Sequence, residues 1–209
     1  MSLARAYAAA LDSGEFSARR EIAELRRRVL AEWARRLFEL AHLDGSMLDT
    51  LRLGPVGELS IELKMAVSEA VREVEPDPHA LAHALGNALD TLQAIEARPR
   101  GKKTSETRKH TGSYFTPIAV AERMALAAFA ALDEPATRSV RVCDPAVGGG
   151  AFLLEAARAL VRARQSAGAT EHEALSRVHS TLYGVDASEI AIAVTEAALL
   201  LQRRGPVLE

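Results

Sequence analysis

The chain has 209 residues, of which 48% are hydrophobic, 26% charged and 4% aromatic, and its net charge is -2. This length suffices for one ordinary domain or two small ones, and the near balance of charges excludes a protein that is basic over its whole surface. The single cysteine, Cys143, excludes a disulfide framework and a cysteine-based zinc site, and no apolar run is long enough to cross a membrane. We therefore expect a soluble cytoplasmic protein without a membrane partner.

The first 97 residues show the apolar periodicity of amphipathic helices. It predicts helices over residues 4–11, 17–43, 58–74 and 79–95. Ser17 is the expected N-cap of the second helix, and Asp77 followed by Pro78 opens the fourth. Trp33 lies on the apolar stripe of the second helix, so we expect a core residue rather than a base-stacking platform. Residues 1–97 are thus predicted to form a helical bundle.

Residues 98–113 interrupt this periodicity with a basic segment. Its seven basic side chains face one acid, Glu106, and it is predicted to be a linker. Two roles remain open for it: a solvated hinge, or contacts with DNA phosphates.

Strands and helices alternate from residue 114 to residue 209. We expect a helix over 117–131, a buried strand over 139–143, a helix over 151–167, a strand over 181–185 and a final helix over 188–203. This alternation is typical of parallel strands joined by a right-handed crossover, so a partial Rossmann-like α/β domain is expected to follow the bundle. Cys143, in the first strand, is expected to be a buried and inert side chain.

A glycine-rich turn follows the first of these strands. Asp144 ends the strand, Gly148, Gly149 and Gly150 follow, and a helix then begins. Glycines let the backbone pass close to a ligand at the strand ends. The G-x-G-x-x-G spacing of dinucleotide sites is incomplete here, whereas an acid before the glycines suits a cationic ammonium such as that of S-adenosylmethionine. Asp186 ends the second strand, where a carboxylate can accept both ribose hydroxyls.

Three segments in order carry a resemblance to a known family. TGSYFTP at 111–117, DPAVGGGAFL at 144–153 and LYGVD at 182–186 resemble the amino-terminal part of adenine-N6 DNA methyltransferases of the large restriction-modification type. The resemblance covers residues 108–203 and implies a class I S-adenosylmethionine-binding domain. In that family the first segment closes over the methionine end of the cofactor, the second forms the cofactor loop and the third holds the ribose. Two departures are mild: Val147 and Gly149 replace residues usual in the family's loop.

The resemblance implies the following cofactor-binding residues: Tyr114, Phe115, Thr116, Pro117, Asp144, Pro145, Ala146, Gly148, Gly150, Phe152 and Asp186. Capping rules independently make Thr116 an N-cap and Pro117 the first helical residue. Tyr114 and Phe115 just before them are expected to cover the cofactor.

The family extracts its target adenine and holds it with an Asn/Asp/Ser-Pro-Pro-Tyr/Phe segment. The chain has no Pro-Pro dipeptide and only two predicted strands. We therefore assign no catalytic residue and no metal ligand, and expect the amino-terminal portion of a site-specific DNA methyltransferase that is inactive alone. Its expected partners are DNA, through the complete enzyme, and either the missing catalytic and target-recognition regions or a second chain that covers the exposed sheet edge.

Two other functions stay open from the sequence. One is a non-catalytic regulatory or assembly module that retains a methyltransferase-like fold. The other is a methyltransferase for small molecules or proteins, because a cofactor loop alone does not define the substrate. The segment TGSYFTP disfavours the latter.

Overall fold

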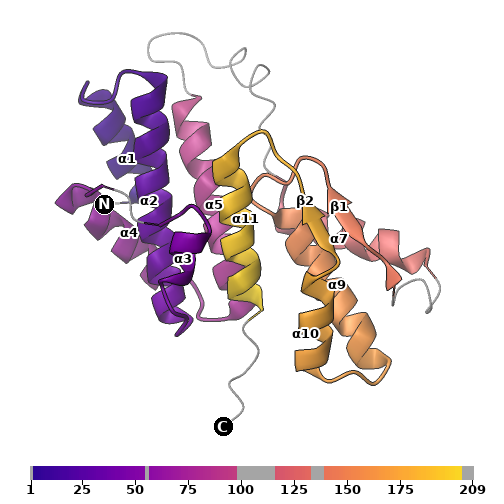
Figure 1. Ribbon diagram of the computed structural model, residues 1–209. Coiled ribbons are helices and arrows are strands. Elements are labelled where there is room, and N and C mark those ends of the chain that lie inside the picture. Colours follow the sequence, from indigo (N-terminus) through magenta and orange to yellow (C-terminus); the bar gives the residue numbers. More distant parts are fainter. Residues whose placement is uncertain (1, 55–56, 98–115, 133–138, 204–209) are drawn as a thin grey trace.

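The structure is a computed structural model that describes residues 2–54, 57–97, 116–132 and 139–203. Its described residues are mostly helical, with one small parallel sheet (Figure 1). The amino-terminal part holds α1 (Leu3–Asp12), α2 (Arg19–Leu40), α3 (Met47–Thr50), α4 (Ile61–Arg72) and α5 (Pro78–Glu96). The second part holds α7 (Ile118–Ala130), β1 (Val142–Asp144), α9 (Ala151–Ser166), α10 (Glu171–His179), β2 (Leu182–Gly184) and α11 (Glu189–Gln202).

Capping explains where the longest helices of the bundle begin. Asp77 accepts a hydrogen bond from the N–H of Ala80 at 2.9 Å, so α5 starts as predicted. The predicted N-cap of α2 is wrong, because Ala18 holds that position instead of Ser17. The carboxylate of Glu21 accepts hydrogen bonds from the backbone N–H groups of both residues, each at 2.9 Å. The side chain of Glu21 thus bonds the two N–H groups that precede the helix, and no side chain caps the N–H groups of the first turn.

The helical bundle buries a large apolar core that confirms most of the predicted stripe on α2. Trp33 is a core residue with 8% of its surface exposed, and Val29 and Leu37 are fully buried. Leu40, the last residue of α2, is 39% exposed. The residues of α11 that join this core are Ala191, Ala193, Val194, Ala197, Ala198 and Leu201.

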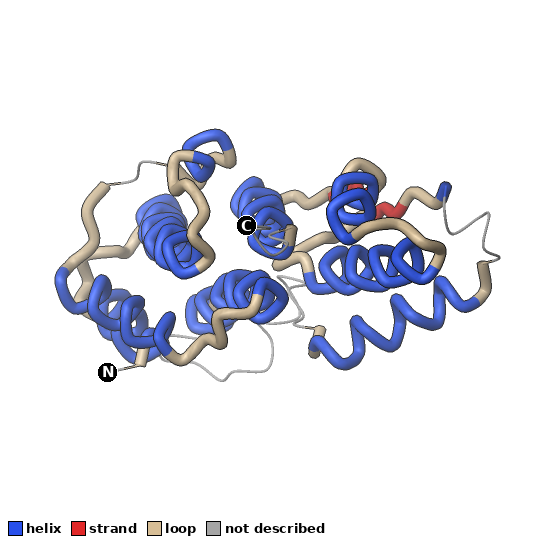
Figure 2. The backbone as a smooth tube through the Cα atoms, turned by 90° about the horizontal axis from the view of Figure 1, so that it is seen from below, coloured by secondary structure: helices blue, strands red, loops and turns tan. Residues whose placement is uncertain are grey.

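The final helix thus packs into the core of the bundle although it follows the second strand in sequence. Figure 1 shows α11 alongside α5, and in Figure 2 it lies between the strands and the rest of the bundle. Leu154 of α9 joins the same core. The division into residues 1–97, 98–113 and 114–209 stays a prediction. The predicted linker, residues 98–113, lies outside the residues that the structure describes.

The sheet confirms parallel pairing, with Val142 opposite Leu182, Cys143 opposite Tyr183 and Asp144 opposite Gly184. Val142 and Leu182 pack against a small second cluster centred on Leu160 of α9. Successive residues of a strand point to opposite faces, so Cys143 and Tyr183 lie on the other face.

The prediction that Cys143 is buried is wrong. Its side chain is exposed, and Tyr183 beside it is 47% exposed. The prediction assumed a sheet covered on both faces, as parallel sheets usually are, whereas helices of the described residues cover one face. The strand is also shorter than predicted, because β1 begins at Val142.

Two short helices were not expected from the sequence, α3 and α10. The second begins with a capping box in which Thr170 and Glu173 bond each other's backbone N–H groups. No helix among the described residues is long and apolar enough to cross a membrane.

Candidate functional site

The glycine turn after β1 has the backbone geometry that its sequence predicts. Gly148 and Gly150 have φ values of 52° and 85°, in the left-handed region that favours glycine. The N–H of Val147 donates to the carbonyl of Val185 at 3.0 Å, which extends the strand pairing beyond the sheet. The turn then leads directly into α9, whose N-cap is Gly150. A tight turn therefore lies between a strand end and a helix amino terminus.

Asp144 lies at the start of this turn. Its Oδ1 accepts a hydrogen bond from the backbone N–H of Ala146 at 3.0 Å. Its Oδ2 is buried and has no hydrogen-bond partner among the described residues. A buried polar atom without a partner is costly, so this oxygen is an acceptor available to a donor from outside the described chain.

Asp186 lies two residues beyond the end of β2 and contacts the same turn. Its Oδ2 accepts from the N–H of Gly148 at 2.9 Å, and its Oδ1 accepts from the N–H of Ser188 at 2.8 Å. The hydroxyl of Thr195 in α11 donates to the carbonyl oxygen of Gly148 at 3.0 Å. The structure therefore brings the two predicted acids to one edge of the sheet, and Asp186 also holds the glycine turn in place.

The bundle contacts the glycine turn through a close approach of two backbones. A Cβ added to Gly86 of α5 would lie 2.3 Å from the carbonyl oxygen of Gly149. Conversely, a Cβ on Gly149 would lie 2.9 Å from the Cα of Gly86. Sequence reasoning missed this contact because the two glycines lie in parts of the chain that were expected to be separate units. The absence of a side chain at Gly86 thus permits α5 to lie directly against the turn.

The remaining predicted cofactor residues either make no side-chain hydrogen bond to the glycine turn that the structure records or lie outside the described residues. Tyr114 and Phe115 lie outside the described residues. Thr116 and Pro117 precede α7, but the N-cap is Pro117 and no side-chain cap is formed, so the predicted Thr116 cap is wrong. Pro145 and Ala146 are exposed in the turn, and Phe152 is half-buried in the first turn of α9.

A second polar cluster, which was not predicted, joins α5 to α9 close to the glycine turn. The Nε2 atoms of His83 and His79 lie 2.8 Å and 3.1 Å from the same oxygen, Oε1 of Glu155. Glu155 is 2% exposed and His83 is 4% exposed. Burial raises the pKa of Glu155, but hydrogen bonds and charge interactions with the two histidines outweigh it and lower the pKa to about 2. The sequence signal was the spacing of two histidines four residues apart on one helix.

The described residues also form a pocket of about 380 Å³, whose lining includes no residue of the glycine turn or of the His79, His83 and Glu155 cluster. It lies among α2, α3, the segment between α3 and α4, and the start of α4, and its lining includes Arg28, Glu32, Asp49 and Lys64. None of the predicted cofactor residues lines this pocket.

Residues 101–204 match the family model of the N-6 DNA methylases. Comparisons with curated proteins and with solved structures found no match. The matched region contains β1, the glycine turn, β2 and both acids at the strand ends. Residues 101–204 of the chain therefore belong to the N-6 DNA methylase family.

Proposed function

We propose that the chain binds S-adenosylmethionine at the sheet edge formed by Asp144, the glycine turn and Asp186, as part of a site-specific DNA adenine-N6 methyltransferase of a restriction-modification type. The observation that carries this proposal is the buried Oδ2 of Asp144, which lacks a hydrogen-bond partner among the described residues. A charged ammonium group placed there makes a charge-assisted hydrogen bond and removes the cost of the unpaired oxygen.

The second acid and the turn fit the remainder of the cofactor. Each carboxylate oxygen of Asp186 accepts one backbone N–H and keeps further acceptor capacity, enough for a pair of ribose hydroxyls. Gly148 carries no side chain that would keep a ligand from the backbone, whereas a Cβ at Gly150 would lie 3.0 Å from Thr195. When bound, this cofactor supplies an electrophilic methyl group. The residues of the chain bind and orient it and hold the glycine turn rigid through Asp186 and Thr195.

The proposal is tested by calorimetric titration with two ligands, S-adenosylmethionine and 5′-methylthioadenosine, which lacks the amino-acid part. Asp144→Asn removes the charge and should weaken S-adenosylmethionine binding by about 10- to 100-fold, the value of one charge-assisted hydrogen bond. The same variant should bind 5′-methylthioadenosine as the wild type does.

Asp186→Asn should weaken both ligands, because both carry the ribose. Asp49→Asn, an exposed aspartate on α3, serves as the control and should change neither affinity. Absence of S-adenosylmethionine binding by the wild-type chain would refute the proposal, and so would equal affinity of the Asp144→Asn variant.

We further propose that the chain does not methylate DNA by itself. The chain has no Pro-Pro segment of the kind that holds the target adenine. The open face of the sheet, with Cys143 and Tyr183 exposed, supports a partner region or a second chain that covers it. Methyl transfer to adenine in duplex DNA by the purified chain, measured with a radiolabelled methyl donor, would refute this.

A non-catalytic assembly module is the second candidate function, and the same open face favours it. The two candidates differ in the cofactor. An assembly module that has lost cofactor binding produces no binding heat when it is titrated with S-adenosylmethionine. Its partner, when present, still covers Cys143 and protects it from thiol reagents. A methyltransferase portion gives both signals.

A further inference from the structure

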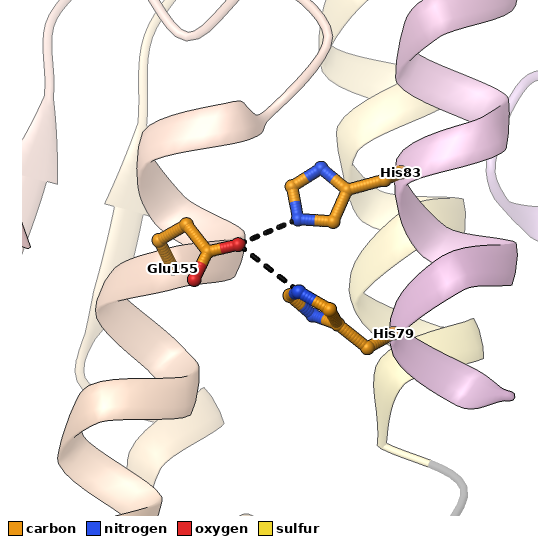
Figure 3. A group of neighbouring side chains, drawn as sticks. All are labelled: His79, His83 and Glu155. Atoms are coloured by element: carbon orange, nitrogen blue, oxygen red, sulfur yellow. Dashed lines mark hydrogen bonds and ion pairs between the residues drawn. The ribbon is translucent and has the colours of Figure 1, made fainter. Parts of the chain in front are cut away.

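Two histidines and a glutamate converge between the bundle and the methylase region. Figure 3 shows His79 and His83 on adjacent turns of α5, with both side chains directed at Glu155 of α9. The potential ligand atoms of the three residues all lie within 4.8 Å of one another. Glu155 and His83 are buried, with 2% and 4% of their surfaces exposed, and the side chain of His79 is 24% exposed. It lies outside the proposed cofactor site, and no residue of that site belongs to it.

From this convergence we propose that His79, His83 and Glu155 form a binding site for a divalent transition-metal ion, with Zn²⁺ the ion that two imidazoles and one carboxylate fit best. A tetrahedral zinc ion with bonds of about 2.0–2.1 Å sets its ligand atoms about 3.3 Å apart. The two Nε2 to Oε1 distances, 3.1 Å and 2.8 Å, are within about 0.5 Å of this value. The two imidazole nitrogens lie no more than 4.8 Å apart, so an ion draws them together by at most about 1.5 Å. A water molecule would be the fourth ligand of the ion.

The spacing of the ligands favours a metal site because two of them come from a single rigid helix. Residues four apart on an α-helix lie one above the other, so α5 presents both imidazoles on one face without loop ordering. Glu155 follows the glycine turn by about one helical turn of α9. A bound ion would therefore tie α5 to α9 beside the contact of Gly86 with Gly149.

Arg158 is the competitor for this site. Its Nη1 lies 3.3 Å from Nε2 of His79 and 3.7 Å from Oε2 of Glu155, where its charge balances the buried carboxylate in the ion-free form. The same atom also lies 3.4 Å from Oε1 of Glu122 on α7, and its side chain is 34% exposed. The guanidinium can thus move outward to Glu122 when a divalent ion takes over the neutralisation of Glu155.

Metal binding also requires a change of tautomer at His79. In the ion-free form its Nδ1 lies 3.4 Å from the amide nitrogen of Gln202, which fits a proton on Nε2 and a hydrogen bond to Glu155. A metal on Nε2 moves that proton to Nδ1, where it needs an acceptor. The Oε1 of Gln202 is buried and has no hydrogen-bond partner within the described part of the chain. A turn of the Gln202 amide supplies the acceptor at the expense of its hydrogen bond to the carbonyl oxygen of Leu154.

The test uses the full chain after treatment with a chelator, titrated with Zn²⁺ against a chromophoric chelator, with Co²⁺ as a spectroscopic probe. We expect one equivalent of metal, a higher thermal midpoint and the visible absorption of a four-coordinate Co²⁺ ion. His83→Gln and Glu155→Gln should each weaken binding by at least about tenfold. Arg158→Gln should strengthen it, because the competing cation is gone.

Two controls separate this site from accidental binding. His172→Gln changes an exposed histidine on α10, and Cys143→Ser removes the exposed thiol, so neither should alter the affinity. Absence of stoichiometric Zn²⁺ binding would overturn the proposal. Binding that survives in both His83→Gln and Glu155→Gln would overturn it as well, and so would binding that Arg158→Gln weakens. Because the Arg158→Gln variant is expected to gain affinity, loss of folding cannot produce the expected pattern.

Discussion

The contact of α5 with the glycine turn predicts that a substitution which normally stabilises a helix will destabilise this one. An alanine in a helix interior is more favourable than glycine by about 1 kcal/mol. At Gly86, however, the new Cβ would lie 2.3 Å from the carbonyl oxygen of Gly149, where an ordinary C···O contact is about 3.3 Å. The helix and the turn must therefore separate by about 1 Å.

The cost of this separation can be weighed against the gain in helix propensity. Overpacking of a well-filled interior costs about 1–3 kcal/mol, and the neighbour here is backbone, which cannot rotate away. The net change for Gly86→Ala is a loss of about 1 kcal/mol in the free energy of unfolding. Gly45→Ala is the matched control, because nothing lies within 4 Å of its Cβ and its φ is not left-handed. That variant should gain up to about 1 kcal/mol.

Urea denaturation followed by circular dichroism measures both changes. The two variants should differ by about 2 kcal/mol in opposite directions from the wild type, or by several degrees in thermal midpoint. Gly86→Ala should also weaken S-adenosylmethionine binding, because the displaced turn carries Gly148 and Gly150. If Gly86→Ala is as stable as Gly45→Ala, then α5 does not lie against the turn, and the derived role of the bundle in shaping the site is refuted.

Three further predictions concern buried polar groups away from the site. The hydroxyl of Tyr7 donates to Glu96 at 2.6 Å, and burial raises the pKa of that carboxyl. Tyr7→Phe should therefore lower the free energy of unfolding, measured in urea, by about 1–2 kcal/mol. Tyr183→Phe, on the exposed face of the sheet, should leave it almost unchanged. Burial lowers the pKa of His179 from 6.5 to about 4, so the protein should lose stability, on the order of 2 kcal/mol, as the pH falls through that interval, and His179→Gln should remove this dependence. Burial raises the pKa of Asp90 from 3.8 to about 6. The contribution of this carboxyl to the free energy of unfolding therefore falls as the pH rises through that interval. Asp90→Asn should be more stable than the wild type at pH 7 by about 1–2 kcal/mol. A thermal midpoint of Asp90→Asn below that of the wild type at neutral pH would contradict the last of these.

Local signals in the sequence predicted local structure well. Asp77 and Pro78 specify the start of α5. Gly148 and Gly150 adopt positive φ values, which other residues rarely adopt, so the glycines in the sequence predicted the turn. The two acids at the strand ends were predicted to lie at one edge because parallel strands place their carboxyl ends together. Each of these inferences depends on neighbours in sequence or on a single βαβ unit.

Tertiary contacts were not predictable in the same way. Leucine and alanine positions on a helix show that one face is buried, but they do not say against which element. The apolar positions of α11 fit the outer layer of a sheet equally well, and the exposure of Cys143 depends on whether a further layer covers the strand. Packing of α11 against a sheet would produce the same apolar periodicity as the observed packing against the bundle.

The helix α11 connects the helical bundle with the methylase region. Its alanine-rich face packs into the core of the bundle, while Thr195 on the same helix bonds the carbonyl oxygen of Gly148 in the glycine turn. Gly86 approaches that turn from α5, and Glu155 of α9 bonds two histidines of α5. Apolar burial and buried polar pairs both cross the expected boundary, so removal of residues 2–97 exposes one side of α11 and leaves Glu155 without its imidazole partners. The glycine turn then loses the backbone against which it lies, which means that the shape of the proposed cofactor edge depends on a helix outside the region that matches the family.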